Sequence, residues 1–383
     1  MKDYRYLLRR KMKQPRRFAR ARRATPRTRR LAPAAWLAAP LLAALLLPLA
    51  VVPLRGGQPA PPAVPQATAS PAPPGPAAEE APQPEVSVYL SHSGQIETLP
   101  LEDYVSGVLA AEMPADFELE ALKAQAVAAR TFIVRRLLAG DRSGVPVPGA
   151  DVTDTVSHQA YVSRSTLEQK WTHGGKSAGL AKVRRAVRET RGVVMTYQGQ
   201  PITASFFASS GGYTENSEDY WNAAVPYLRS VASPWDQEIT PNLAVTYTFT
   251  NAELIQKLGI EDIPASGDLA DSSLAKPISS SSSGLSAEVL SLTDGHRVKK
   301  ISIGGTVFTG REVREKLGLR SSQFTWKRKG SKVLITTYGN GHGVGMSQWG
   351  ANGMAKEGST ATQILKHYYS GVSFNQVSTL LKK

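Results

Sequence analysis

Two predicted helices on either side of Pro114, between residues 101 and 138, constrain the fold more than any other part of the sequence. At about 100° per residue, one face of the first helix carries four apolar residues and one acid. These are Leu101, Tyr104, Val105, Val108 and Glu112. Pro114 cannot continue the helix and biases Met113 away from helical angles, so we expect Glu112 at the helix end, on its apolar face.

A carboxyl group in that position has a raised pKa, because burial and the negative end of the helix dipole both disfavour its charged form. A partly protonated carboxyl group near neutral pH is suited to general acid catalysis. Burial perturbs structural carboxylates too, so the pattern leaves a catalytic and a structural Glu112 open.

The second helix has an apolar stripe that also contains two cations, Lys123 and Arg130. The stripe itself is Leu119, Leu122, Ala126, Ala129, Ile133 and Leu137. A cation on a core face is unfavourable unless a carboxylate or an anionic ligand meets it. The alternatives are a structural ion pair, or long side chains that reach past the edge of the core.

The N-terminal region divides into three parts of different composition. Residues 1–30 hold fourteen Lys or Arg against one acid, which accounts for +13 of the chain's formal charge of +15. We predict a basic cytoplasmic tail here and a transmembrane helix at 31–54, an uncharged stretch long enough to span a bilayer. A cleaved signal peptide is the main alternative. The apolar neighbour argues against nucleic-acid binding by the tail.

Residues 55–85 are rich in Pro and Ala and are predicted to form an extended linker. The rest, 86–383, alternates helical and strand-like patterns and is predicted to be an α+β domain. Within it, residues from about 245 to 330 are predicted to be a small inserted α/β subdomain. We therefore predict a single-pass membrane protein whose folded domain lies outside the cytoplasm.

Two glycine-containing loops are further candidates for a functional site. Ser209–Trp221 (SSGGYTENSEDYW) places two glycines and several polar residues directly after an aromatic strand, which suits a loop that approaches a ligand closely. A simple hairpin connection is the alternative. The second loop, residues 339–351 (GNGHGVGMSQWGA), lacks the lysine of a P-loop, so the pattern argues against nucleotide binding.

Four motifs in order resemble the stage II sporulation protein D family, which is related to the LytB amidase-enhancer domain. They are LEDYVSGVLAAEMP with LKAQAVAARTF, SSGGYTENSEDYW, YLRSVASPWD and GHGVGMSQWGA, and the resemblance covers about residues 86–383. Members of that family are lytic transglycosylases. They cleave the β-1,4 bond between N-acetylmuramic acid and N-acetylglucosamine in peptidoglycan strands without stem peptides, and leave 1,6-anhydro ends.

The resemblance implies roles for particular residues. Glu112, in the A-E-M-P motif, corresponds to the catalytic acid/base. The positions expected to bind or support the substrate are Lys123, Arg130, Ser210, Gly211, Gly212, Tyr227, Arg229, Asp236, His342 and Gln348. Several relatives hold zinc with a histidine and cysteines near the S-x-S-G-G loop, but this chain has no cysteine, so we expect no metal site and no cofactor. A hydrogen-bonding role is expected for His342.

The resemblance also implies partners and a process. The expected process is remodelling of the septal wall during sporulation engulfment. The expected partners are the glycan strands, a wall amidase that removes stem peptides, and a polytopic membrane scaffold protein. The alternative function is a non-catalytic wall-binding module that activates a peptidoglycan amidase.

Overall fold

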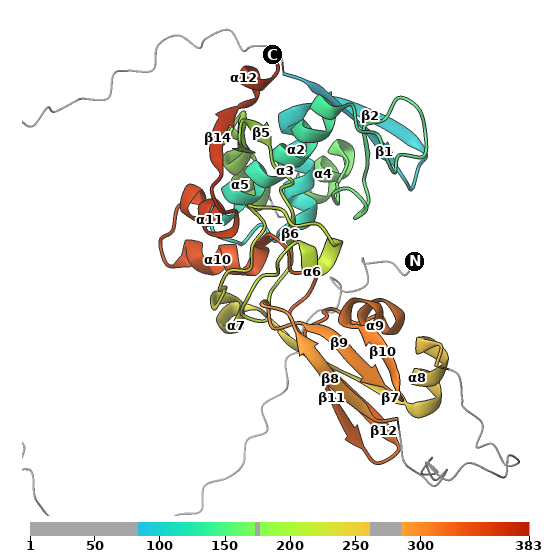
Figure 1. Ribbon diagram of the computed structural model, residues 1–383. Helices are drawn as coiled ribbons and strands as arrows, with labels where there is room; N and C mark the ends of the chain where they lie inside the picture. Colours follow the sequence, from blue (N-terminus) through green and yellow to red (C-terminus); the bar gives the residue numbers. More distant parts are fainter. Residues whose placement is uncertain (1–82, 173–176, 261–284, 383) are drawn as a thin grey trace, which may run out of the picture. The chain divides into compact units, whose positions relative to one another are not determined.

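A computed structural model describes residues 83–172, 177–260 and 285–382 (Figure 1). Within these ranges the predicted mixture of helices and strands is confirmed. The two helices expected around Pro114 are α2 (Leu101–Glu112) and α3 (Leu119–Ala139). Met113 ends α2 in extended backbone, with φ −123° and ψ 142°, as expected for the residue before a proline.

The first core is built around α3. Alanines at 121, 124, 126, 128 and 129 are fully buried on this helix, and such small side chains let neighbouring elements approach closely. Its neighbours are α2, α5, α10, α11 and β4. The helices of this part, besides α2 and α3, are α4 (Arg164–Thr172), α5 (Ser177–Glu189), α6 (Glu218–Trp221), α7 (Trp235–Ile239), α10 (Gln348–Lys356), α11 (Ala361–Tyr368) and α12 (Val377–Leu380).

Three small sheets surround these helices. One has the order β2-β1-β3, one has the order β14-β4-β5, and in the third β13 pairs in parallel with β6. The strands are β1 (Glu85–Leu90), β2 (Gln95–Pro100), β3 (Val152–Thr153), β4 (Val193–Tyr197), β5 (Gln200–Pro201), β6 (Phe206–Phe207), β13 (Met346–Ser347) and β14 (Ser373–Gln376). Strand β6 directly precedes the first glycine loop and β13 lies within the second, so this pair brings the two loops together.

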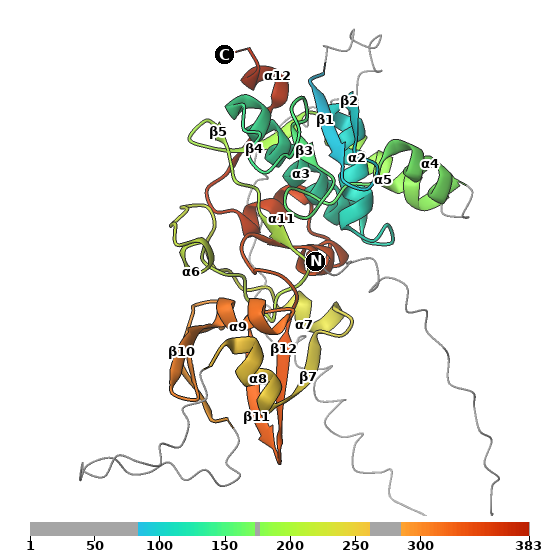
Figure 2. The same ribbon diagram turned by 90° about the vertical axis from the view of Figure 1, so that its right-hand side faces the viewer.

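Residues 244–338 contain a second, separate core with two three-stranded sheets, β10-β9-β8 and β11-β12-β7. Helices α8 and α9 contact each other and pack against β7 and β9 (Figure 2). Both helices begin with a capping box, from Thr250 to Glu253 and from Thr309 to Glu312. The elements are β7 (Ala244–Thr250), α8 (Asn251–Leu258), β8 (Ala287–Leu292), β9 (Val298–Ile303), β10 (Thr306–Thr309), α9 (Gly310–Leu317), β11 (Phe324–Lys329) and β12 (Lys332–Tyr338). The boundaries of the predicted domains stay predictions.

The sequence of residues 201–208 (PITASFFA) predicts a single strand, but the structure does not form one there. Its ends belong to two different sheets, because β5 pairs with β4 whereas β6 pairs with β13. Between them the Thr203 N–H bonds to the Tyr227 hydroxyl instead of to a neighbouring strand. A side chain distant in sequence thus replaces the ladder bond that the alternating pattern predicts.

The predicted localisation, a single crossing of a membrane, is corrected by the structure. Among the described residues, no helix has both the length and the apolar character that a crossing requires. The longest described helix, α3, has 21 residues but carries five charged side chains, which explains why it fails this criterion. The predicted tail, the predicted span at 31–54 and most of the predicted linker lie outside the described residues.

Candidate active site

Glu112 lies at the carboxyl end of α2, as predicted, with a half-buried side chain. Its Oε1 accepts a hydrogen bond of 2.8 Å from the Ala160 N–H. Ala160 follows Gln159, whose side chain accepts a hydrogen bond from Tyr104 on the buried face of α2. The loop at residues 159–160 therefore fixes one oxygen of the carboxyl group.

Burial raises the pKa of Glu112, and this effect is larger than the lowering by the Ala160 N–H and by the side-chain amide of Gln348. Gln348, the first residue of α10, is buried. Its Nε2 makes no hydrogen bond of regular geometry with any group in the described parts of the chain. A protonatable carboxyl group and a side-chain amide that acts on it therefore lie side by side.

Arg130 is fully buried and is held by a structural ion pair. Its Nη2 lies 2.6 Å from Oε2 of Glu102, and its Nη1 donates to the carbonyl of Val193 at 3.1 Å. Glu102 also accepts from the Gly192 N–H, which ties α2 and α3 to the start of β4. No hydrogen bond or ion pair joins Arg130 to Glu112 within the described ranges.

Lys123 likewise pairs with carboxylates other than Glu112. Its Nζ lies 2.7 Å from Glu120 and 2.6 Å from Glu189 on α5. Both cations therefore pair with structural carboxylates, and neither bonds to Glu112 within the described ranges. Sequence alone left that alternative open, because α5 and the amino end of α2 could not be placed.

Asp236 is fully buried and links the two glycine loops. Its carboxylate accepts hydrogen bonds from Ser210 (2.8 Å), Ser233 (2.6 Å) and Ser347 (2.7 Å). Burial raises the pKa of Asp236, while these three hydroxyl groups lower it. With no exposed surface, Asp236 can support the site but cannot touch a ligand.

The S-S-G-G segment is more than a hairpin turn, since it packs against the second glycine loop. Ser209 and Asn340 exchange backbone hydrogen bonds of 3.1 and 2.8 Å. At Gly211 a Cβ atom would lie 2.1 Å from Oε1 of Gln323, and Gly212 has φ +115°. Gly212 therefore has a backbone conformation that favours glycine, whereas a Cβ at Gly211 would displace the Gln323 side chain.

His342 is enclosed by aromatic rings and is neutral. Its ring centroid lies between 5.5 and 5.7 Å from those of Phe207, Tyr220 and Trp221. Nδ1 accepts the N–H of Val344 at 3.1 Å. Burial, with a smaller contribution from the charge of Arg297, lowers the pKa of His342 to about 3. Across the described ranges, no three His, Cys, Asp or Glu side chains are grouped as metal ligands would be.

Tyr227 and Arg229 follow the S-S-G-G loop but bond elsewhere than to Glu112. The Tyr227 hydroxyl accepts the Thr203 N–H at 3.0 Å, and Nη1 of Arg229 donates to Glu218 at 2.9 Å. The structure thus brings Glu112 and Gln348 together, and separately gathers Ser210, Asp236 and both glycine loops.

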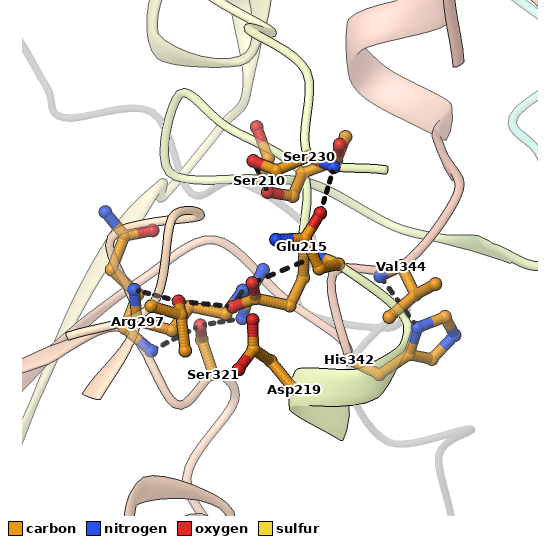
Figure 3. Close-up of polar contacts among 12 residues, drawn as sticks. Ser210, Glu215, Asp219, Ser230, Arg297, Ser321, His342 and Val344 are labelled. Carbon is orange, nitrogen blue, oxygen red and sulfur yellow. Dashed lines mark hydrogen bonds and ion pairs between the residues drawn. The ribbon is translucent and has the colours of Figure 1, made fainter. Parts of the chain in front are cut away.

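Sequence reasoning missed a buried ion pair between the two cores (Figure 3). Arg297, which precedes β9, lies 3.7 Å from Glu215 in the loop after Gly212, and both side chains are 2% exposed. Nη1 of Arg297 donates to Ser321 at 2.8 Å, and Thr293 donates to Glu215 at 2.6 Å. Burial lowers the pKa of Arg297 to about 10 and raises that of Glu215. A lone arginine before a strand carries no sequence signal for this contact.

Residues 89–197, which contain Glu112, match the family model described as "Stage II sporulation protein". The chain is 46% identical over 298 residues to "Stage II sporulation protein D" of Bacillus amyloliquefaciens, which covers 78% of this chain and 80% of that protein. It is also 46% identical to the protein of that name in Bacillus subtilis strain 168, with 78% and 81% covered. This chain belongs to the stage II sporulation protein D family.

A third relative carries another name. The "Amidase enhancer" of Bacillus subtilis strain 168 is 31% identical over 319 residues, which covers 70% of this chain and 40% of that protein. The resemblance found in the sequence motifs is thereby confirmed at the level of the family. In this member of the family, Glu112 at the end of α2, the buried Asp236 and both glycine loops belong to one folded unit.

Proposed function

We propose that this member of a sporulation family is a peptidoglycan lytic transglycosylase. It would cleave the β-1,4 bond between N-acetylmuramic acid and N-acetylglucosamine in strands without stem peptides, in wall remodelling during engulfment. The observation that supports the proposal best is Glu112, a half-buried carboxyl group with a raised pKa beside an amide donor.

In the proposed reaction Glu112 acts twice. Its protonated carboxyl group donates to the glycosidic oxygen as the bond from that oxygen to C1 of the muramic acid breaks. The resulting carboxylate then takes the proton from the C6 hydroxyl group of the same sugar, whose oxygen bonds to C1. The proton returns to Glu112 and no water is consumed, so one carboxylate suffices where hydrolytic glycosidases use two.

The neighbours of Glu112 suit this cycle. The Ala160 N–H occupies Oε1, which leaves Oε2 for the substrate. The buried side-chain amide of Gln348 lies beside the carboxyl group of Glu112, where it can orient that group for proton transfer. Asp236 would act indirectly, by holding the Ser347 hydroxyl group next to Gln348.

The decisive experiment incubates the protein with glycan strands that have lost their stem peptides and analyses the ends by mass spectrometry. Wild type should release 1,6-anhydro ends, and Glu112→Gln should release none while keeping the wild-type melting temperature. Equal products from both proteins, or none from either, would reject the assignment. Activity that survives EDTA would argue against a metal-dependent reaction.

The second candidate is a non-catalytic activator of a wall amidase, which the name of the 31% identical relative favours. If the protein is an activator, wild type and Glu112→Gln should stimulate a purified amidase equally well. In the transglycosylase proposal the amidase is a partner that prepares the substrate, and the polytopic scaffold protein stays an expectation.

A further inference from the structure

A cavity of about 390 Å³ lies outside the candidate active site, between the last turn of α3 and the β4–β5 hairpin. Arg135 and Leu138 line it from α3, and Tyr197, Gln200 and Ile202 line it from the hairpin region, with Tyr227 beside them. The hairpin packs against α3 (Figure 2). A volume of this size accommodates a small ring-shaped ligand.

The side chains around this cavity combine one cation with two aromatic rings. Arg135 is exposed and forms no ion pair or hydrogen bond with any other described residue. Asp141 is within electrostatic range of Arg135, but its ion pair is with Arg136. The guanidinium group of Arg135 therefore keeps its fork of donors for a ligand, in the geometry that suits a carboxylate.

The two rings supply the apolar part of the site. The centroids of Tyr197 and Tyr227 lie 5.4 Å apart, at an interplanar angle of 50°. The Tyr227 hydroxyl oxygen accepts from the Thr203 N–H, so its own proton remains available. Amphipathic rings of this kind contact the apolar face of a sugar and still offer a polar group at the edge.

The cavity is far from Glu112 along α3. Glu102, at the start of α2, pairs with Arg130 on α3, so the two helices run in opposite directions and Glu112 lies near the beginning of α3. Arg135 is sixteen residues beyond Leu119, which corresponds to about 24 Å of helix. A ligand in this cavity is therefore not in contact with the reacting bond.

We propose that this cavity is a second binding site for a sugar that bears a carboxylate, namely muramic acid with a free lactyl group. Removal of the stem peptide leaves that carboxylate on each muramic acid, so the site would select strands that an amidase has processed. This inference rests on the proposed function for the identity of the strand. The residues that line the cavity predict only a ligand in which an anionic group is attached to a ring.

A binding experiment tests the site directly with the full chain carrying Glu112→Gln, which prevents turnover. The probes are the disaccharide of N-acetylglucosamine and N-acetylmuramic acid with a free lactyl carboxylate, its methyl ester, and a tetraglutamate peptide. Arg135→Gln should weaken binding of the free acid roughly tenfold, since an arginine–carboxylate contact is worth about that factor. Arg188→Gln, at an exposed position of α5 with the same loss of charge, should leave it unchanged.

Three results would overturn the proposal. They are equal binding of the acid and the ester, equal losses in Arg135→Gln and Arg188→Gln, and binding of the peptide without the disaccharide. The cleavage assay described above reads the proposed function separately. If the protein binds the free acid through Arg135 but releases no anhydro ends, the second binding site is supported and the transglycosylase proposal is contradicted.

Discussion

At the scale of single residues, the properties of Glu112 come from its partners more than from its own helix. Its place at the end of α2 could be predicted, because Pro114 and the apolar face are both local features. Ala160 and Gln348 could not be predicted as its neighbours, since they reach Glu112 from distant loops. The direction of the pKa shift was predictable, whereas the two groups that limit it were not.

This arrangement predicts the pH dependence of the proposed reaction. The general acid must be protonated, so kcat/KM should fall as the pH rises through the raised pKa of Glu112. Gln348→Ala removes a group that lowers this pKa, and the alkaline limb should therefore move to higher pH, with a lower maximum. Initial rates between pH 4 and 9 measure it. Gln95→Ala, exposed on β2, is the control, and an unchanged limb in Gln348→Ala would contradict the role of the amide.

Asp236 gives a second prediction for a single residue. Its folded pKa is raised, so the stability that depends on its protonation is present below the unfolded pKa and is lost as the pH rises through the folded pKa. Urea unfolding of wild type should show this loss, and Asp236→Asn should not. Asp236→Ala strands three serine hydroxyl groups and should destabilise by about 1–3 kcal/mol at pH 7. Equal pH dependence in wild type and Asp236→Asn would contradict the account.

At the scale of elements, periodicity predicted α2 and α3 well but could not show what their polar positions meet. The stripe on α3 correctly placed Arg130 inside the core. Its partner, Glu102, lies at the opposite end of α2 from Glu112, so the ion pair needs the antiparallel packing of both helices. The strand pattern of residues 201–208 failed for a similar reason, because the Tyr227 side chain takes one of its backbone donors.

The two cations on α3 should therefore respond differently to substitution. Arg130→Met leaves Glu102 without its buried partner and should lower the free energy of unfolding by about 3–5 kcal/mol. Lys123→Met should have a clearly smaller effect, since its carboxylates are accessible to water. Chemical denaturation measures both. A larger loss of unfolding free energy in Lys123→Met than in Arg130→Met would contradict the view that the buried ion pair contributes more to stability.

Gly343 in the second glycine loop and Gly358 after α10 are a matched pair for substitution. Gly343 has φ +93°, and a Cβ there would lie 2.4 Å from Nη2 of Arg297. Gly358 has φ +90°, with nothing within 4 Å of a Cβ. Both alanine variants carry the backbone strain, but only Gly343→Ala also displaces a buried arginine, so its melting temperature should fall further. Equal melting temperatures would mean that the arginine moves freely.

At the scale of the whole molecule, the sequence could not predict what the second core does. Its buried Arg297 pairs with Glu215, so residues of the second core help to hold the loop that follows Gly212. A buried ion pair of this kind depends on three-dimensional proximity, which neither charge pattern nor periodicity encodes.

A double-mutant cycle tests this connection. Arg297→Met and Glu215→Gln should each destabilise the protein, and the double variant should lose less than the sum, with a coupling energy of about 0.5–3 kcal/mol. Denaturation of the four proteins measures the coupling. Strictly additive effects would show that the two side chains do not support each other. The exposed pair Arg164 and Glu168 on α4 serves as a control with little expected coupling.

The close pairing of early and late segments also affects when a newly made chain becomes active. The Glu118 N–H bonds to the side chain of Asn352, 234 residues later in the sequence. Asn352 lies on α10 together with Gln348, whose side-chain amide reaches Glu112. Synthesis therefore has to pass residue 352 before Glu112 and the amide of Gln348 can meet. Under the proposed function, shorter fragments that contain Glu112 but lack Gln348 should therefore release no anhydro ends from glycan strands.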